Sequence, residues 1–205
     1  MNCGEQGTKI QMYPLIKRLF DIIASLFGIL ALAPFFILLI CVIKLSSPGP
    51  AFFKQKRFRR HKKFFTMLKF RTMRNDAPHD TPTHLLKNPY AYITPIGRLL
   101  RKTSLDELPQ LFHILTGDMS LVGPRPALWN QDDLVAERDK YGANDVRPGL
   151  TGLAQIKGRD ELPIEVKASY DAEYVKKMSL LFDCKIFFLT VLSVTKGEGV
   201  KEGGN

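Results

Sequence analysis

The longest uninterrupted apolar segment of the chain runs from Ile22 to Ile43 and contains no charged residue. At a rise of about 1.5 Å per residue, a helix over this segment is just long enough to cross the hydrocarbon core of a bilayer. The pattern therefore predicts a membrane helix near the N-terminus. A cleaved signal peptide is the alternative, because Ala31-Leu32-Ala33 has the small residues of a cleavage site. The nine apolar residues that follow Pro34 argue against cleavage.

Two features favour a helix that enters the bilayer and returns over a helix that crosses it. Pro34 follows Ala33 near the middle of the segment, where proline removes a backbone hydrogen bond and bends a helix. Basic residues lie on both flanks: Lys17 and Arg18 precede the segment, and the stretch KQKRFRRHKK follows it. Lys and Arg beside membrane segments favour the cytoplasmic side, so both ends are expected in the cytosol. A straight crossing, with the shorter and less basic N-terminus outside, is the alternative.

The segment after the membrane helix has the pattern of a hairpin followed by a loop. Residues 50–73 place a polar, basic centre between two aromatic runs, which predicts a β-hairpin with a basic tip. Such a charge run is also typical of a surface that lies on anionic lipid. Residues 75–90 contain three prolines among Asp, Asn and Thr, which predicts a loop.

Helical periodicity dominates the second half of the chain. Residues 96–115 predict one kinked helix or two short helices, because Pro109 interrupts their apolar spacing. Another helix is expected over residues 131–141. Residues 180–197 combine a strongly apolar face with Asp183 and Lys185, and suit either the core or the membrane interface.

Charge and cysteine content narrow the range of partners. The 205-residue chain has a formal net charge of +10, which suits a polyanion: nucleic acid, an anionic bilayer or a phosphorylated substrate. Cys3, Cys41 and Cys184 are widely spaced and form no Cys-x-x-Cys or Cys/His cluster. Neither a disulfide framework nor a zinc site is therefore expected.

An adjacent pair of carboxylates, Asp106 and Glu107, lies in the stretch KTSLDELPQLF. One interpretation is structural: Ser104 caps a helix, Glu107 completes a capping box, and Asp106 lies in the positive first turn. The other is catalytic. Constrained arginines elsewhere favour the catalytic interpretation, because Arg125 lies between two prolines in GDMSLVGPRP, and Arg147 begins an Arg-Pro-Gly turn in RPGLTGLAQI. A rigid guanidinium suits phosphate oxygens.

Four motifs in order resemble the bacterial sugar transferase family: KFRTM at 69–73, RKTSLDELPQLF at 101–112, GDMSLVGPRP at 117–126 and RPGLTGLAQI at 147–156. The resemblance covers about residues 13–200. The most similar members are small monotopic phosphoglycosyl transferases, which move a phosphosugar from a nucleotide diphosphate sugar to a polyprenyl phosphate. The resemblance implies a mixed α/β, mostly helical fold: a re-entrant membrane helix, then a small cytosolic catalytic domain with a short β-hairpin and interfacial amphipathic helices.

The resemblance also implies roles for individual residues. Asp106 matches the family's nucleophile and Glu107 the second acid of its catalytic dyad. Further matches to basic or polar motif positions suggest substrate-binding residues: Lys69, Arg101, Arg125, Arg147, Gln155 and Asp183. The family requires Mg²⁺, which would neutralise the diphosphate beside Asp106. The expected partners are a UDP-sugar, polyprenyl phosphate and membrane lipids.

These expectations divide the chain into an N-terminal extension (1–12), a re-entrant membrane helix (13–48), a catalytic domain (49–200) and a tail (201–205). The expected location is the bacterial inner membrane, with the catalytic domain facing the cytosol. One departure from the family is Ala33-Pro34 in place of the common Ser-Pro, which bears on the depth and sharpness of the bend. A non-catalytic binder of nucleic acid or anionic lipid is the rival interpretation. It leaves the acid pair and the two Arg-Pro turns unexplained, so no nucleic-acid partner is expected.

Overall fold

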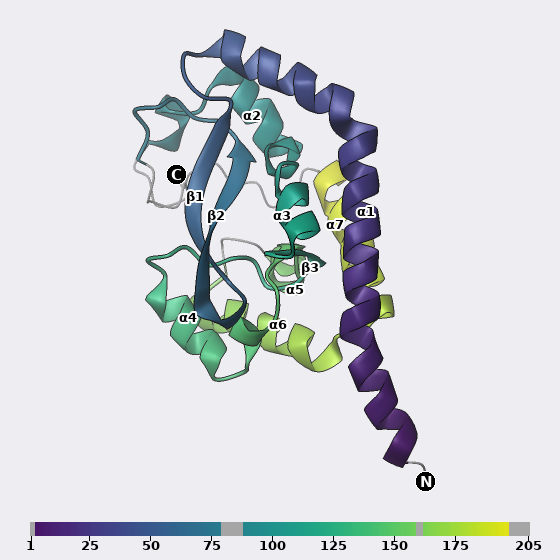
Figure 1. Ribbon diagram of the computed structural model, residues 1–205. Coiled ribbons are helices and arrows are strands. Elements are labelled where there is room, and N and C mark those ends of the chain that lie inside the picture. The colour runs from purple at the N-terminus through teal and green to yellow at the C-terminus, as the bar shows by residue number, and fades with distance from the viewer. Residues whose placement is uncertain (1–2, 79–87, 159–161, 197–205) are drawn as a thin grey trace.

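The long apolar helix dominates the architecture of the protein. The computed structural model describes residues 3–78, 88–158 and 162–196, so the predicted tail and the middle of the predicted loop lie outside the described residues. Helix α1 (Cys3–Ser46) runs along one side of the body and bends over its end (Figure 1). Its segment Tyr13–Ser46 has 34 residues and is long and apolar enough to cross a membrane. Pro34 lies inside α1, and proline is a usual cause of such a bend.

One stripe of α1 packs against the body on both sides of Pro34. The buried members of this stripe recur at helical spacing: Asp21, Ser25, Phe36, Leu39 and Ile43. Asp21 accepts a hydrogen bond from the Leu121 backbone N–H at 3.0 Å, and Phe36 contacts the ring of Phe70, with the ring centroids 5.5 Å apart. Both halves of the helix are therefore attached to the same domain.

Lys17 and Arg18, which were expected to flank the membrane, make contacts with other parts of the protein. Lys17 forms an ion pair with Asp183 at 2.6 Å. Arg18 donates to the carbonyl oxygens of Ile114 and Leu115, which lie at the C-terminal end of helix α3 (Gln110–Thr116). Cations at a helix C-terminus interact favourably with its unpaired carbonyls. Ala33 and Pro34, by contrast, are exposed on the outer face of α1.

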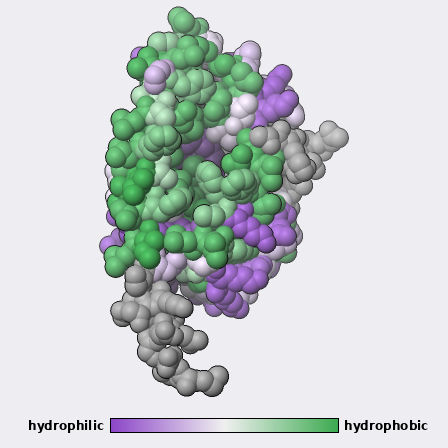
Figure 2. Space-filling view, turned by 90° about the vertical axis from the view of Figure 1, so that its right-hand side faces the viewer, coloured by the Kyte–Doolittle hydropathy of each residue, from purple (hydrophilic) through white to green (hydrophobic). Residues whose placement is uncertain are grey.

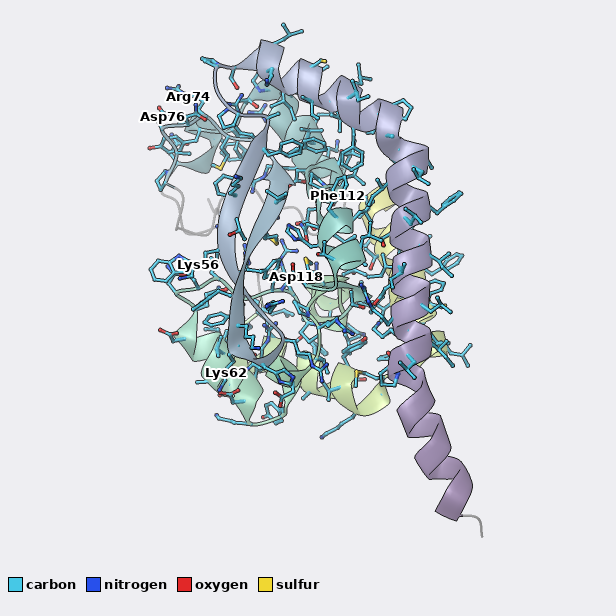
Figure 3. All side chains as sticks on the ribbon, viewed as in Figure 1. Lys56, Lys62, Arg74, Asp76, Phe112 and Asp118 are labelled. Carbon is cyan, nitrogen blue, oxygen red and sulfur yellow. The ribbon has the colours of Figure 1, made fainter. Side chains whose placement is uncertain are left out.

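The predicted hairpin is confirmed. Strands β1 (Phe52–Arg59) and β2 (Lys63–Phe70) pair antiparallel, joined by the short turn η1 (Arg60–Lys62). Its basic tip is docked on the protein, because Lys62 pairs with Asp139 and His61 lies 3.0 Å from Asp145. Lys62 lies at the end of the hairpin nearest α4 (Asp132–Asp139) (Figure 3). Residues 60–62 remain exposed to solvent, so these contacts attach the tip to the body without burying it.

The prediction of two short helices around Pro109 is confirmed, whereas the capping box is wrong. Helix α2 (Pro95–Lys102) is followed by the 3₁₀ turn η4 (Leu105–Glu107) and by α3. Ser104 adopts a left-handed conformation with φ 56° and its side chain makes no capping hydrogen bond. The helix that is capped is α2, where the Thr94 side chain accepts from the Gly97 N–H.

The remaining elements pack around a hydrophobic core to which both helices and strands contribute. The structure contains a parallel pair of three-residue strands, β3 (Ser120–Val122) and β4 (Gly149–Thr151), and short helical segments η3 (Pro89–Ala91), η5 (Ala143–Asp145) and α5 (Leu153–Lys157). Helix α4 confirms the expectation for 131–141, but α6 (Ile164–Lys177) and the β3–β4 pair were not predicted. The main core includes Ile114, Met119, Tyr174 and Ile186.

Helix α7 (Leu180–Lys196) and α1 together carry an apolar surface. Exposed large apolar residues on them include Leu19, Phe27, Leu30, Ile37, Leu181, Phe188 and Leu192. Figure 2 shows this face as a nearly continuous hydrophobic area with hydrophilic residues at its edges. Exposed apolar areas of this kind mark a site of membrane or protein contact. Asp183, in the first turn of α7, faces inward and is buried.

Candidate active site

A cavity of about 550 Å³ lies between the hairpin, the segment that follows it, and the loops around Arg125 and Gln155. Among the described residues that line it, nine are Lys or Arg and a single one, Asp106, is acidic. Its lining also includes the apolar side chains Phe52, Phe53 and Phe70. A strongly cationic cavity with one carboxylate suits an anionic ligand that meets a nucleophile or a metal ion.

The two carboxylates are held differently by η4. Asp106 is 9% exposed and faces the cavity, whereas Glu107 is tied to two cations. Oε1 of Glu107 accepts hydrogen bonds from Lys69 Nζ at 2.6 Å and from Arg125 Nη2 at 3.0 Å. Both acids lie in the 3₁₀ turn η4, where about three residues per turn direct adjacent side chains roughly 120° apart. Asp106 is thus placed to react, and Glu107 is placed to organise the cations.

The pKa values of the pair move in opposite directions. Burial raises the pKa of Asp106 to about 6, even though Lys69 lowers it; Glu107 adds to the increase. Burial alone would also raise the pKa of Glu107, but Arg125 and Lys69 together more than offset that effect and hold its pKa well below the usual range. Two carboxylates whose environments separate their pKa values have different chemical roles.

The loop that carries Arg125 is fixed by close backbone contacts between two glycine-containing turns. The Gly149 N–H donates to the Pro124 carbonyl at 2.9 Å, and the Gly123 N–H donates to the Thr151 carbonyl at 2.9 Å. A Cβ at position 123 would lie 2.5 Å from the carbonyl oxygen of Arg147, so a side chain there would displace backbone. This approach explains why Gly123, Gly149 and Gly152 are needed, because a Cβ at each would meet backbone atoms of the facing turn.

Four of the predicted substrate-binding residues line the cavity with Asp106. Lys69 comes from the end of β2, Arg101 from the last turn of α2, Arg125 from the loop after β3, and Gln155 from α5. Arg101 also lowers the pKa of Asp106, which places its charge near the carboxylate. The Oε1 atom of Gln155 is buried and makes no hydrogen bond, although Nε2 of the same side chain donates to the Leu150 carbonyl.

Arg147 and Asp183 do not line this cavity, so the predicted grouping with the acid pair is not what the structure contains. Arg147 Nε donates to the Gly117 carbonyl. Burial lowers the pKa of Arg147, and the nearby charge of Arg18 lowers it further. Asp183 accepts hydrogen bonds from Tyr13 and Lys17 of α1 and from Tyr174 of α6. Both residues make contacts that connect elements around the core.

Four further arginines line the cavity and were missed from sequence: Arg57, Arg71, Arg74 and Arg138. Arg57 Nη1 donates to the Pro126 carbonyl, and Arg138 Nη1 donates to the Arg125 carbonyl. Arg71 Nη1 and Nη2 donate to the carbonyls of Pro48 and Ser47, which follow α1. The strand alternation that places Arg57 and Lys69 on one face of the hairpin could have singled out Arg57. Nothing local in the sequence marks Arg138.

The donor set of the cavity fits Mg²⁺ only in combination with a ligand. The described residues contain no group of three or more His, Cys, Asp or Glu side chains that could hold a metal ion by themselves. Mg²⁺ usually takes one or two carboxylates together with substrate phosphates and water. Asp106 can supply one oxygen, and the surrounding Lys and Arg charges disfavour a bare cation. A metal ion is therefore expected to arrive with a phosphorylated molecule.

The long apolar helix and the cationic cavity suit an enzyme that handles phosphorylated molecules at a membrane. A family model described as bacterial sugar transferase matches residues 12–197, and the chain belongs to this family.

Several relatives resemble the chain over most of its length. The sugar transferase EpsL of Bacillus subtilis is 42% identical over 188 residues, which cover 92% of this chain and 91% of EpsL. The exopolysaccharide production protein PSS of Rhizobium leguminosarum bv. phaseoli is 40% identical, over 90% of this chain and 98% of its own. The UDP-glucose:undecaprenyl-phosphate glucose-1-phosphate transferase of Escherichia coli is 38% identical over 86% of this chain, but over 39% of its own length.

Proposed function

We propose that the protein is a phosphoglycosyl transferase that moves a sugar 1-phosphate from a UDP-sugar to undecaprenyl phosphate and releases UMP. The observation that carries this proposal is the single carboxylate, Asp106, in a cavity otherwise lined by Lys and Arg. The name of the Escherichia coli relative supports both the donor and the acceptor. The products of such a reaction begin the assembly of an exopolysaccharide or another glycoconjugate.

In the first step, an Asp106 oxygen attacks the β-phosphorus of the donor. The bond from phosphorus to the bridging oxygen breaks, and UMP leaves with that oxygen and its electron pair. The phosphosugar remains on Asp106 as an acyl phosphate. In the second step, an oxygen of undecaprenyl phosphate attacks the same phosphorus and the carboxylate leaves, which restores Asp106. Nucleophilic catalysis of this kind divides one transfer into two displacements.

The other side chains of the cavity have supporting roles in this proposal. Lys69 and Arg125 share Glu107 Oε1, which keeps both cations oriented toward the β-phosphate. Because the low pKa of Glu107 keeps it charged, this carboxylate orients cations and is not a proton donor. Arg101 adds positive charge beside Asp106. When bound with the diphosphate, Mg²⁺ would neutralise its charge and orient it, with Asp106 as the protein ligand.

The same proposal includes a monotopic arrangement at the inner membrane, with the catalytic domain in the cytosol. Support comes from α1, which packs on one domain on both sides of Pro34 and carries exposed apolar residues on its outer face. Arg71 connects the end of α1 to the strand that carries Lys69, so the cavity lies close to the membrane-facing elements. A lipid phosphate at the interface would then be within reach of Asp106.

The test measures UMP release from UDP-glucose, UDP-galactose and UDP-N-acetylglucosamine by purified protein in nanodiscs, with undecaprenyl phosphate and Mg²⁺. We expect at least one donor to give UMP, and a protein-bound phosphosugar to form with donor alone. Asp106→Asn should abolish both signals, and Glu173→Gln, an exposed change on α6, should abolish neither. Labelled Asp106→Asn protein, or UMP release only when both substrates are present, would contradict the covalent mechanism.

A further inference from the structure

A buried ion pair lies directly behind the loop of Arg125. Arg138, in α4, directs Nε and Nη2 to Oδ2 of Asp171, in α6, at 2.8 and 2.6 Å. Its remaining terminal nitrogen, Nη1, donates to the backbone carbonyl of Arg125 at 3.0 Å. One planar guanidinium therefore links α6 to the peptide unit that carries the proposed phosphate-binding arginine.

The burial of this pair is difficult to explain by stability alone. The side chains of Arg138 and Asp171 are 6% and 1% exposed, and Oδ1 of Asp171 has no hydrogen-bond partner. Burial raises the pKa of Asp171 despite the adjacent arginine, so the carboxylate is held in an unfavourable environment. Apolar residues of similar volume often replace a buried ion pair with no loss of stability. A geometric role accounts better for its presence.

The geometry in front of the pair indicates what that role is. The side chain of Arg125 reaches from the held peptide unit to Glu107, which also binds Lys69. Prolines on both sides of Arg125 limit the backbone, but they do not fix the position of its carbonyl relative to α4. The hydrogen bond from Arg138 does so, and Arg57 acts in the same way on the next carbonyl, that of Pro126.

We propose that Arg138 and Asp171 form a positioning pair that sets the reach of Arg125 toward the diphosphate of the donor. This inference rests on the proposed function. Arg138 borders the cavity, yet its three nitrogens are engaged by Asp171 and by the Arg125 carbonyl, so it acts through Arg125 and not by touching substrate.

The experiment is a double-mutant cycle on the protein in nanodiscs. Arg138→Met/Asp171→Leu removes both charges at similar volume, which avoids leaving one charge buried and unpaired. It is combined with Arg125→Ala, and four proteins are compared: the wild type, the pair variant, Arg125→Ala and the combination. For each, kcat and KM for the best UDP-sugar and the dissociation constant for UDP are measured. UDP provides a probe that does not depend on the sugar.

We expect pair removal to lower kcat/KM at least about tenfold and to raise KM and the UDP dissociation constant, because Arg125 is displaced. In the Arg125→Ala background, the same change should have less than about a twofold effect. A lower folded fraction would reduce kcat equally in both backgrounds and leave KM unchanged. Equal losses in both backgrounds, or unchanged KM and UDP affinity, would overturn the inference.

Two further proteins sharpen the test. Arg138→Lys keeps a cation beside Asp171 but cannot serve the carboxylate and the Arg125 carbonyl with one rigid fork, so it should show the same dependence on Arg125. Glu173→Gln/Lys177→Gln removes an exposed ion pair from the same helix and should leave every constant unchanged. A wild type that neither binds UDP nor releases UMP overturns the proposed function and this inference together. An active wild type with independent effects overturns the inference alone.

Discussion

At the scale of single residues, Asp106 and Glu107 are adjacent yet lie in opposite electrostatic environments. Glu107 has two cationic partners, so its charge is favoured by the fold. Asp106 faces the cavity, and its burial disfavours the charged form that the proposed attack requires. A buried carboxylate that must be ionised to act gains reactivity at the expense of stability.

This cost should appear in the pH dependence of folding. The pKa of Asp106 is about 6 in the folded protein against an ordinary value of 3.8, so ionisation destabilises the fold progressively from about pH 4 to pH 6 and fully above that. Asp106→Asn should therefore be more stable than the wild type at pH 7.5, by roughly 2–3 kcal/mol. The difference should vanish near pH 4. Thermal unfolding in metal-free nanodiscs measures it; equal stability at pH 7.5 would contradict the strained environment of Asp106.

Arg125 provides the second prediction at this scale. Arg125→Lys keeps the charge but loses the planar fork that can bind Glu107 and a phosphate oxygen at once. We expect activity to fall at least ~10-fold, because a charge-assisted contact contributes roughly 1.5–3 kcal/mol. Arg60→Lys, at the exposed hairpin tip, is the matched control and should retain activity. A folded Arg125→Lys protein with near-normal UMP release would remove Arg125 from the site.

At the scale of elements, the structure depends on how closely two turns approach each other. Gly123→Ala should lower the free energy of unfolding by about 1–3 kcal/mol and reduce UMP release, because its Cβ would lie 2.5 Å from the Arg147 carbonyl oxygen. Gly142→Asn is the control: the φ of Gly142 is 67°, which Asn tolerates, and the nearest atom to its Cβ is 3.9 Å away. Similar melting temperatures for the two variants would show that the turn after β3 and the turn before β4 can move apart without lowering the stability of the protein.

The same elements show what could be predicted from the sequence. The long helix, the hairpin and the break at Pro109 follow from local patterns, and the structure contains all three. The parallel β3–β4 pair could not be predicted, because strands of three residues have no detectable alternation and their contact joins residues far apart in the chain. The left-handed turn at Ser104 could not either, since the same letters describe a capping box.

The candidate site was also predictable only in part, because motifs mark single residues and do not show which of them meet in space. Motif resemblance brought forward Asp106, Lys69, Arg101 and Arg125, which share one cavity. It also brought forward Arg147 and Asp183, which lie outside this cavity and make contacts that join elements of the fold. The partners of Asp183 lie on α1 and α6, more than a hundred residues apart in the chain, so no local pattern could show these contacts.

At the scale of the whole molecule, the proposed monotopic arrangement depends on how α1 packs on the body. The uncharged part of α1, from Ile22 to Ile43, is roughly 33 Å of helix against a hydrocarbon core of about 30 Å, so its length permits a straight crossing. A straight crossing would have to pull one half of the buried stripe away from the body, either around Asp21 or around Phe36 and Ile43. A bent helix keeps both halves attached, and in the proposed arrangement its exposed outer face lies in lipid. Lys17 and Arg18 bind protein groups, so their charges are weaker support for a cytosolic N-terminus than the sequence suggests. The packing of both halves of α1 on the body is the stronger support for a bent helix.

The corresponding prediction is that both ends of the chain lie in the cytosol. In a background with Cys3→Ser, Cys41→Ala and Cys184→Ala, single cysteines at Gln6→Cys and Glu202→Cys are probed on intact cells with a membrane-impermeant thiol reagent. Neither should be labelled until the cells are opened. Labelling of the Gln6→Cys protein from outside, with Glu202→Cys protected, would mean that α1 crosses the bilayer.

Pro34→Leu tests whether the bend causes this topology. Restoring the missing backbone hydrogen bond favours a straight helix, which can cross the bilayer only by losing contacts such as that between Phe36 and Phe70. We expect Gln6→Cys in the Pro34→Leu protein to become reactive from outside and UMP release to fall. Ala33→Leu, an exposed change on the same turn that leaves the proline in place, is the control and should keep both the protection and the activity. If Pro34→Leu stays protected and active, the packing of the two halves on the body is enough to hold the bend, and proline only adapts to it.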